Sequence, residues 1–421
     1  MKRIEVFYQD RKAGELAAAG NHTSFQFAPD FIQGGIQLSP LRMKLRQEPY
    51  IYGEAEFGYL PPVLSDSLPD LYGRAVMNRW FAGKFGAEYR PTPLDKLAYV
   101  GTGGMGALSY RPALDAFPPE VLREMDLREE QRLAAAAIGQ QQLEKLEKLR
   151  RAVHTVGGRF PKALLVIDPG TGLYYEDDPR LDPRFERWIV KFGLPAAERD
   201  NLLNYPEIEY AYSCMAREAG IRVPRTRLLT TESEEGKLVH FAIERFDVVD
   251  GTRLHVASLS ALTEIPAGRL ELDYRDLFSV GLDLCRDLRE VREAFRRMLF
   301  NIAMHNVDDH GKNHAFVFDE RGWKLAPAYD LTFSDVSAPN EYTYASRAMP
   351  VNGNPLNPKR KDLVNLGERF GLRRGDCEAM IDHVAKMAAR TREYLERSGV
   401  PAIHSEVVAS AVDRSLHESF R

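Results

Sequence analysis

The spacing of apolar residues changes once along this chain of 421 residues, and that change constrains the fold most strongly. Up to about residue 258, short apolar runs alternate with turns rich in glycine, proline and charged residues, as is typical of strands. From about residue 270 onward, apolar residues recur every three or four positions, which predicts amphipathic helices. The sequence therefore predicts an α+β protein with a mixed α/β amino-terminal part and a mainly α-helical carboxyl-terminal part.

Within the amino-terminal part, residues 3–9 alternate apolar and polar side chains and are predicted to form a strand. Residues 98–112 predict a strand, a glycine-rich bend and a second strand. Residues 65–86 begin with capping residues and continue with helical spacing. Residues 128–153 predict a long amphipathic helix that packs or connects and carries no chemistry. Further on, one helix is expected at 206–220 among strands at 163–168, 187–193, 227–233, 238–247 and 252–258.

Composition narrows the class of protein. The formal net charge is −4, which argues against coating of nucleic acid by bulk charge. The cysteines are three, far apart and without metal-type spacing, so a reduced compartment and a packing role are expected for Cys214, Cys285 and Cys377. The first residues lack the apolar core of a signal peptide, and no run approaches a membrane span. We expect a cytoplasmic protein that does not contact a membrane.

The densest functional signal is the block at residues 306–333, NVDDHGKNHAFVFDERGWKLAPAYDLTF. Asp308 and Asn313 stand five positions apart in a loop after an apolar helix. Two short strands follow, at 314–318 and 323–326, and the second leads to Asp330. This order of loop carboxylate, loop amide, hairpin and second carboxylate is the kinase catalytic arrangement in outline.

In that arrangement Asp308 orients the substrate hydroxyl, while Asn313 and Asp330 bind magnesium, which prefers oxygen ligands and shares the phosphates of ATP. A different interpretation is a metal cluster of His305, His310 and His314 with a neighbouring aspartate, as in a metallohydrolase. Its spacing fits no closed zinc site, and the nearby Asn313 and Lys312 suit phosphate better.

Three further segments complete the pattern. Lys191 ends an apolar strand and matches the strand lysine that contacts ATP phosphates, although an isolated lysine there would more often face solvent. Glu209 is its expected helix partner, with Glu207 and Glu218 as competitors. Residues 240–247 are either an ordinary core strand or a hinge that holds adenine. Finally, Gly157 and Gly158 permit close approach to phosphates and Lys162 adds charge, although a diglycine is usually only a turn.

Together these segments resemble the HipA family of serine/threonine-kinase toxins over nearly the whole chain. The motifs that carry the resemblance are IQLSPLRM, SDSLPDLYGR, GMGALSYRP, TVGGRFPKA, WIVKF, YAYSCMAREAGI, AIERFD, NVDDHGKN and LAPAYDLTF. The resemblance implies a two-lobed kinase-like fold that uses ATP and Mg²⁺.

By motif, the resemblance implies a role for each matching residue. It makes Asp308 catalytic and Asn313 and Asp330 the metal ligands. Lys191 contacts phosphates. The residues implied around the rest of the nucleotide are Gly157, Gly158, Lys162, Glu244, Arg245, Phe246, His310, Lys312 and Tyr329.

The resemblance also implies regulation and partners. Family toxins commonly carry a serine before the glycine loop whose autophosphorylation silences the kinase, and Thr155 stands there in this chain. The segment GGRFPK departs from the loop of the best-known toxins, which affects loop geometry and target choice. The usual partner is a HipB-like helix-turn-helix antitoxin, so DNA is expected to be reached only through it. Family targets include aminoacyl-tRNA synthetases and similar translation proteins, but nothing in this sequence identifies a target.

The resemblance divides the chain into 1–125, a β-rich HipA-type subdomain; 126–258, with the glycine loop, phosphate lysine and hinge; and 259–421, the helical kinase lobe. Two other functions use the same residues. One is a kinase-like enzyme that phosphorylates a small-molecule hydroxyl. The other is an inactive kinase-like module that binds a DNA-binding antitoxin.

Overall fold

The computed structural model describes residues 3–114, 124–136, 161–177, 181–194, 206–233, 236–269, 271–319, 321–334 and 347–421. The chain divides into two compact units. Unit 1 consists of Met1–Phe192 and Leu229–Ala257, and unit 2 consists of Gly193–Leu228 and Ser258–Arg421. Both units contain helices and strands, so the predicted α+β class is confirmed.

Unit 1 begins with a five-stranded sheet in the order β4-β3-β2-β1-β5, in which all neighbours are antiparallel. Its strands alternate buried and accessible side chains, so one face forms a core. The predicted strand at 3–9 and the predicted helix at 65–86 are confirmed by β1 and α3. The elements are β1 (Arg3–Tyr8), β2 (Arg11–Ala19), β3 (His22–Phe27), α1 (Pro29–Gly34), β4 (Tyr50–Tyr52), η1 (Ala55–Phe57), α2 (Pro62–Ser65), α3 (Leu71–Phe85), α4 (Pro93–Val100) and β5 (Leu108–Arg111).

The prediction of a strand at residues 98–100 is wrong, because these residues end helix α4. Thr92 and Asp95 form a reciprocal capping box, with the Asp95 amide donating to Thr92 Oγ1 at 3.2 Å and the Thr92 amide donating to Asp95 Oδ2 at 2.9 Å. Pro93 at the first helical position fits the same start. The helix signal therefore lies upstream of the apolar residues that suggested a strand.

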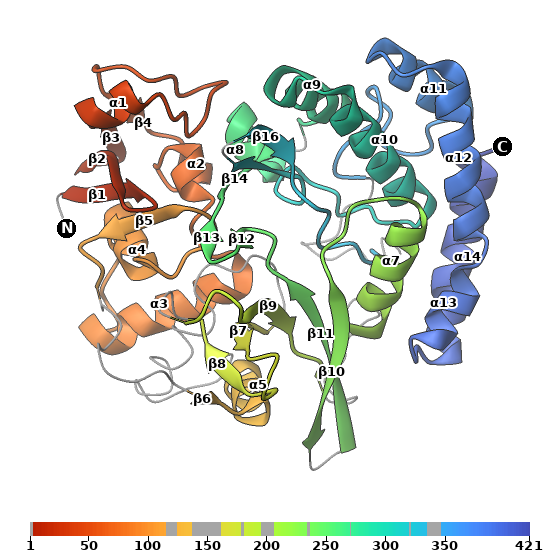
Figure 1. Cartoon of the computed structure of the whole chain (residues 1–421), viewed down its shortest axis with the longest axis horizontal. Coiled ribbons are helices and arrows are strands. Elements are labelled where there is room, and N and C mark those ends of the chain that lie inside the picture. Colours follow the sequence, from red (N-terminus) through yellow and green to blue (C-terminus); the bar gives the residue numbers. More distant parts are fainter. Residues whose placement is uncertain are drawn as a thin grey trace. The chain divides into compact units, whose positions relative to one another are not determined.

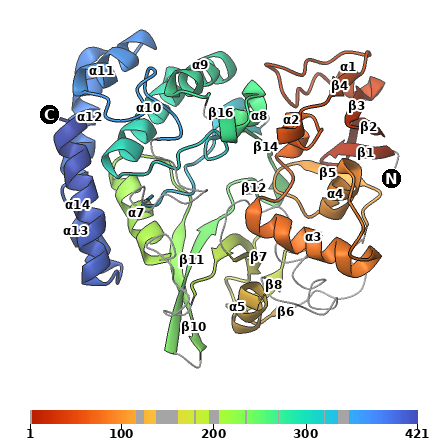
Figure 2. The ribbon, with the colours of Figure 1, turned by 180° about the vertical axis from the view of Figure 1, so that it is seen from behind.

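The second sheet of unit 1 has six strands in the order β10-β11-β9-β7-β8-β6. Strand β7 is buried along its whole length, and α5 packs against it. In the view of Figure 2 the strands β7 and β8 lie beside α5. The elements are β6 (Glu124–Met125), α5 (Leu127–Ala136), β7 (Lys162–Ile167), β8 (Tyr174–Glu176), β9 (Glu186–Lys191), β10 (Thr226–Ser233) and β11 (Gly236–Glu244), followed by β12 (Val248–Val249), β13 (Thr252–Arg253) and β14 (His255–Ser258).

Unit 2 is mainly helical, as the spacing after residue 270 predicts. Helix α10 is buried along most of its length and packs against α9, α12 and α14, while α7 packs against α13 (Figure 1). Helix α10 ends at Ala303, and a loop and a β-hairpin follow it. The elements are α7 (Pro206–Glu218), α8 (Leu259–Thr263), η4 (Ala267–Arg269), α9 (Tyr274–Cys285), α10 (Leu288–Ala303), β15 (Ala315–Asp319), β16 (Gly322–Leu325), α11 (Arg360–Arg369), α12 (Arg374–Ala388), α13 (Thr391–Arg397) and α14 (Ala402–Ser419).

Helices α12 and α13 are separated by a short break at residues 389–390. The buried Thr391 hydroxyl donates a hydrogen bond to the Ala388 carbonyl at 2.6 Å, where the first helix ends. A hydroxyl that bonds to a nearby carbonyl competes with the helical ladder and favours a break. Among the described residues, none of the helices combines the length and the apolar character needed to cross a membrane.

Candidate functional site

The loop that carries Asp308 follows α10 directly. Helix α10 is capped at Met304, and His305 has a positive φ of 52°, which turns the chain out of the helical direction. A non-glycine residue in this region is uncommon and is often found where a backbone is held for function. The chain then runs through residues 306–314 without regular structure and enters β15.

Asp308 and Asn313 are brought together within this loop. The Asn313 side-chain Nδ2 donates a hydrogen bond to the Asp308 carbonyl at 2.8 Å, and the Asn313 amide donates to the His310 carbonyl at 2.8 Å. Because Nδ2 is directed at the main chain, Oδ1 is the atom of Asn313 that suits a metal ion. The Asp308 side chain is 51% exposed, and its Oδ1 lies 3.8 Å from His310 Nε2.

The hairpin β15–β16 returns the chain to the same loop. Phe316 lies opposite Leu325 in its antiparallel register, and the Ala326 amide donates to the Ala315 carbonyl at 2.8 Å. Beyond it, the Tyr329 hydroxyl donates to the Lys312 carbonyl at 2.6 Å. Tyr329 and Lys312 are the neighbours in sequence of Asp330 and Asn313, the two predicted metal ligands.

Asp330 itself has a positive φ of 56°. Aspartate tolerates this conformation better than most residues, but it is still a costly one for a side chain with a Cβ. Its fixed backbone and the Tyr329 hydrogen bond are consistent with a carboxylate that is held for a ligand. The donor set of one amide oxygen and one carboxylate also fits magnesium, which keeps few protein ligands when it shares phosphates.

Gly311 closes the turn between the two predicted residues because no side chain fits there. A Cβ on Gly311 would lie 2.6 Å from Ser260 Oγ and even closer to Leu272 Cδ1. The Ser260 amide also donates to the Gly311 carbonyl at 3.2 Å. The glycine of the DDHGKN segment thus permits close packing of the loop on α8 and on Leu272, two residues before α9.

The sequence reasoning missed the buried neighbour of Asp308. Asp309 is 1% exposed and forms an ion pair with Arg347, with Nη1 and Oδ2 2.9 Å apart. The Tyr274 hydroxyl also donates to Asp309 Oδ2 at 2.6 Å. Burial, followed by the nearby charge of Asp309, raises the pKa of Tyr274 well above its ordinary value. The signal in the sequence is the aspartate doublet itself, since two adjacent carboxylates rarely share one environment.

The histidines of the alternative metal interpretation have separate surroundings. The His305 ring lies against Phe333, with centroids 5.7 Å apart. His314 is buried, and burial together with the charge of Arg297 lowers its pKa to about 3. Within the described part of the chain, no group of three or more histidine, cysteine or acidic residues could hold a metal ion.

In unit 1, the predicted phosphate lysine Lys191 lies opposite a second lysine. Lys162 of β7 and Lys191 of β9 are direct antiparallel partners, so their side chains leave the same face of the sheet. Lys162 is 1% exposed, and Lys191 Nζ lies 6.0 Å from the ring centroid of Phe241. The contact of either lysine with phosphates stays a prediction.

The predicted hinge follows directly from β11. The Arg245 amide donates to the Arg187 carbonyl at 2.8 Å and continues the pairing of β11 with β9. The Arg245 guanidinium is buried between two carboxylates: Nη2 lies 2.7 Å from Asp247 Oδ2, and Nη1 bonds to Asp177. Although burial by itself lowers the pKa of Arg245, these carboxylates raise it overall. Any contact of Arg245 with adenine is thus left to its backbone.

The remaining predicted residues are either on α7 or outside the described residues. Glu207 and Glu209 are buried on α7 of unit 2, and Glu218 lies 2.5 Å from Arg390 in an ion pair. Thr155, Gly157 and Gly158 lie outside the described residues. Their roles stay predictions, as does the partner of Lys191.

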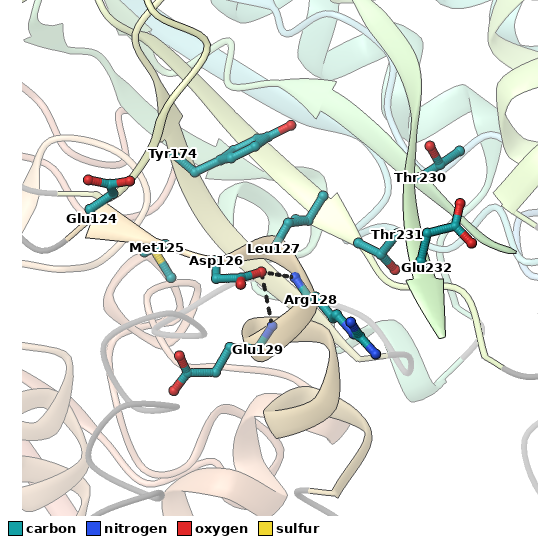
Figure 3. Close-up of a pocket in the computed structure, with 10 residues that line it drawn as sticks. All are labelled: Glu124, Met125, Asp126, Leu127, Arg128, Glu129, Tyr174, Thr230, Thr231 and Glu232. Atoms are coloured by element: carbon teal, nitrogen blue, oxygen red, sulfur yellow. Dashed lines mark hydrogen bonds between the residues drawn. The ribbon is translucent and has the colours of Figure 1, made fainter. Parts of the chain in front are cut away.

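Unit 1 also contains a pocket of about 550 Å³ that includes none of the predicted residues (Figure 3). It lies at the start of α5, where Asp126 Oδ1 accepts the Arg128 amide at 2.8 Å. Its rim is rich in carboxylates. The lining residues are Glu124, Met125, Asp126, Leu127, Arg128, Glu129, Tyr174, Thr230, Thr231 and Glu232.

Comparison with known proteins defines the class of this fold. Over 99% of this chain and 96% of the other, it is similar to a solved structure of the Shewanella oneidensis MR-1 toxin–antitoxin system HipA, HipB and its operator DNA, with a TM-score of 0.66 and 19% identity. The fold is therefore the two-lobed, kinase-like α+β fold that the sequence predicts.

Family models identify the chain more closely. The HipA N-terminal domain matches residues 4–111, and the HipA-like C-terminal domain matches residues 154–391. The chain belongs to the HipA family.

The curated relatives match only part of this chain. A Sinorhizobium fredii protein named "Putative kinase Y4dM" is 29% identical over 154 residues, which span 34% of this chain and 36% of that protein. A Haemophilus influenzae protein named "Putative kinase" is 25% identical over 238 residues, or 50% of this chain and 69% of the relative. The match thus spans little more than a third of the first relative.

Proposed function

We propose that this chain is an ATP- and Mg²⁺-dependent serine/threonine protein kinase of the HipA type. The observation that supports it best is the geometry of one loop in unit 2. Asp308 is half exposed, its carbonyl accepts the Asn313 side chain at 2.8 Å, and the Tyr329–Lys312 hydrogen bond of 2.6 Å ties the Asp330 segment to the same loop. A kinase needs these three oxygen-bearing side chains from a loop and the segment after a hairpin.

In this proposal Asp308 orients the hydroxyl of the substrate and accepts its proton. The hydroxyl oxygen forms a bond to the γ-phosphorus of ATP, the bond from that phosphorus to the β,γ-bridging oxygen breaks, and ADP leaves. Asn313 Oδ1 and the Asp330 carboxylate hold magnesium, which neutralises phosphate charge when bound. The exposure of Asp308 suits a group that must reach a protein hydroxyl.

Other residues of the proposal bind the nucleotide. Lys191 contacts phosphates, and Lys162, its direct neighbour across β9 and β7, adds positive charge beside it. The backbone of 244–246 holds adenine. His310, Lys312 and Tyr329 surround the nucleotide on the side of the catalytic loop.

Regulation and partners are proposed by analogy with the family. The Shewanella protein of this fold was solved with HipB and operator DNA. By analogy we propose a HipB-like helix-turn-helix antitoxin as partner, with DNA reached through it, and a protein substrate of the translation apparatus in the cytoplasm. Thr155 is the proposed site of a silencing autophosphorylation.

Phosphotransfer tests the proposal directly. Purified protein is incubated with Mg²⁺ and γ-labelled ATP, alone and with a lysate treated with phosphatase, and the label is located by mass spectrometry. Asp308→Ala should lower turnover by about 10²–10⁴-fold, the usual effect of removing a positioned acid–base group. The matched control is Asp382→Ala in the same unit, whose carboxylate is 68% exposed and 2.7 Å from Arg360. This surface variant should keep wild-type turnover.

The outcomes separate the candidate functions. Label on serine or threonine of a protein, lost in Asp308→Ala, supports the proposal. Equal labelling by wild type and Asp308→Ala refutes the assignment. Label only on small molecules indicates the alternative enzyme, and nucleotide-independent binding of the antitoxin without any turnover indicates the inactive module.

A further inference from the structure

Two adjacent aspartates of the catalytic loop have opposite environments. The Asp308 side chain is 51% exposed, whereas that of Asp309 is fully buried. Because the two residues share a peptide group, a fixed position for one carboxylate limits the directions open to the other. The contacts of Asp309 are therefore also constraints on Asp308.

Asp309 accepts three hydrogen bonds from two segments distant in sequence. Oδ2 accepts from the Tyr274 hydroxyl at 2.6 Å and from Arg347 Nη1 at 2.9 Å. Oδ1 accepts from the Met349 amide at 3.2 Å. The Ala348 amide also donates to the Val307 carbonyl at 2.9 Å, which joins the loop to the same segment. The loop is thereby held on its buried side by α9 and by residues 347–349.

The same network reaches the end of α10. Asn301 Nδ2 donates to the Tyr274 hydroxyl at 3.0 Å, and Asn306 Nδ2 donates to Asn301 Oδ1 at 3.0 Å. Arg347 Nη1 also donates to the Asn306 carbonyl at 3.0 Å. These side chains are buried, so each hydrogen bond acts in a medium where leaving it unmade is costly. The arrangement resists small displacements of the loop.

We infer that Asp309 is the positioning residue of the phosphoryl transfer, and that its buried contacts with Arg347 and Tyr274 hold Asp308 at the reacting hydroxyl. This inference rests on the proposed function. Asp309 touches no substrate itself, because its carboxylate is enclosed by these partners. Displacement of a catalytic group by about 1 Å costs on the order of 10²-fold in rate, so a support of this kind decides turnover rather than binding.

Three variants test the inference. Asp309→Asn keeps the shape of the side chain but removes the charge that faces Arg347. Asp309→Asn combined with Arg347→Met removes both charges, and replacing a whole buried pair often restores stability that a single change loses. Tyr274→Phe leaves the ion pair and removes the two hydrogen bonds of the hydroxyl, one to Asp309 and one from Asn301, so no charge is left without its partner and it is the variant expected to fold most readily. Ile381→Ala is the control. Ile381 is a buried residue of α12, so its truncation should destabilise unit 2 without touching the Asp309 contacts.

Two readouts distinguish positioning from stability. In steady-state kinetics, Asp309→Asn should lower kcat by about 10²-fold with KM for ATP within about threefold, and Tyr274→Phe should lower kcat by about three- to tenfold. In hydrogen exchange followed by mass spectrometry, peptides within 305–314 should exchange at least about tenfold faster in Asp309→Asn than in wild type. Ile381→Ala should lower the melting temperature and leave both the kcat and this exchange rate near wild type.

The double variant gives the decisive result. If Asp309 positions Asp308, the melting temperature recovers in the double variant while kcat stays low. Recovery of kcat together with the melting temperature overturns the inference, because the pair then serves stability alone. Unchanged exchange within 305–314 in Asp309→Asn overturns it too. If the wild type shows no turnover, but Asp309→Asn still speeds exchange within 305–314, the proposed function is refuted instead. Asp309 then orders the loop without a role in catalysis.

Discussion

Replacing Gly311 by alanine tests whether close packing shapes the catalytic loop. The added Cβ would lie 2.6 Å from Ser260 Oγ and 3.3 Å from the Ser260 amide nitrogen, and closer still to Leu272 Cδ1. Carbon atoms in contact normally lie about 3.5–4.0 Å apart, so these neighbours must move by roughly 1 Å. Ser260 and Leu272 are 0% and 3% exposed, so neither has open space to move into.

The expected cost follows from these distances. Overpacking of a buried site costs about 1–3 kcal/mol, and the reduced freedom of the unfolded chain returns about 0.4–1 kcal/mol when glycine becomes alanine. The midpoints of these two ranges leave a net loss of about 1.3 kcal/mol, which should lower the melting temperature of unit 2 by roughly 3–5 °C, since a body of this size shifts by about 2–4 °C per kcal/mol. Differential scanning calorimetry measures it.

Gly281→Ala is the matched control. Gly281 lies inside α9, a Cβ there would meet nothing within 4 Å, and its φ is not positive. The same chemical change should therefore raise stability by about 0.5–1 kcal/mol, because alanine is the better helix former. Gly311→Ala should therefore lower the stability of unit 2 and Gly281→Ala should raise it, although the chemical change is the same.

A double variant shows whether Leu272 is the obstacle. Leu272→Ala alone should cost about 2–5 kcal/mol through the cavity that it leaves. Combined with Gly311→Ala, the new methyl group enters the vacated space, so the two losses should be less than additive by about 0.5–3 kcal/mol. Strict additivity, or a Gly311→Ala protein as stable as the wild type, would refute the packing argument.

Two further predictions concern unit 1. Burial lowers the pKa of His255 to about 4, against about 6.5 in the unfolded chain. Above pH 6.5 the ring is neutral in both states and the free energy of unfolding is at its full value. As the pH falls from 6.5 toward 4 the unfolded chain takes up the proton first, and up to about 3 kcal/mol of that free energy is lost. Urea unfolding between pH 4 and 8 should show this slope, and His255→Gln should flatten it. Asp247→Asn removes one of the two buried carboxylates that face Arg245 and leaves Asp177 as the remaining counter-charge, so it should cost up to about 3–5 kcal/mol. Asp182→Asn, at the solvent-exposed pair with Arg184, should leave stability nearly unchanged because water screens the pair; equal losses at both sites would contradict the burial argument.

Local patterns predicted much of the fold. The hairpin β15–β16 was expected because two short apolar runs flank a polar turn, and α7 was expected to end at Gly220, which has a positive φ of 78°. Elements whose signal lies outside the apolar run were predicted poorly. Helix α4 is set by Thr92, Pro93 and Asp95 upstream of the residues that suggested a strand.

The order of the candidate site residues along the chain was predictable, but the buried contacts that hold the loop were not. The spacing of Asp308, Asn313 and Asp330 reflects local geometry that a loop and a hairpin impose. The contacts of Asp309 join it to Tyr274 and Arg347, 35 and 38 positions away, and no local pattern encodes such separations. The sequence shows that Asp308 and Asp309 are adjacent, but it does not show that one is exposed and the other buried.

Two of the buried arginine–carboxylate pairs among the described residues lie beside proposed functional residues. Asp309–Arg347 adjoins Asp308 in unit 2, and Asp247–Arg245 adjoins the proposed adenine segment in unit 1. Taking such charges out of water costs several kcal/mol per ion, and well-packed apolar residues are often as stable or more so. Stability alone therefore does not explain charged pairs at these two places. What an ion pair adds over apolar packing is direction, since its hydrogen bonds weaken when the donor and acceptor leave their preferred distance and angle. Both pairs thus cost stability relative to apolar packing, and they fix the backbone beside the residues that the proposed reaction requires.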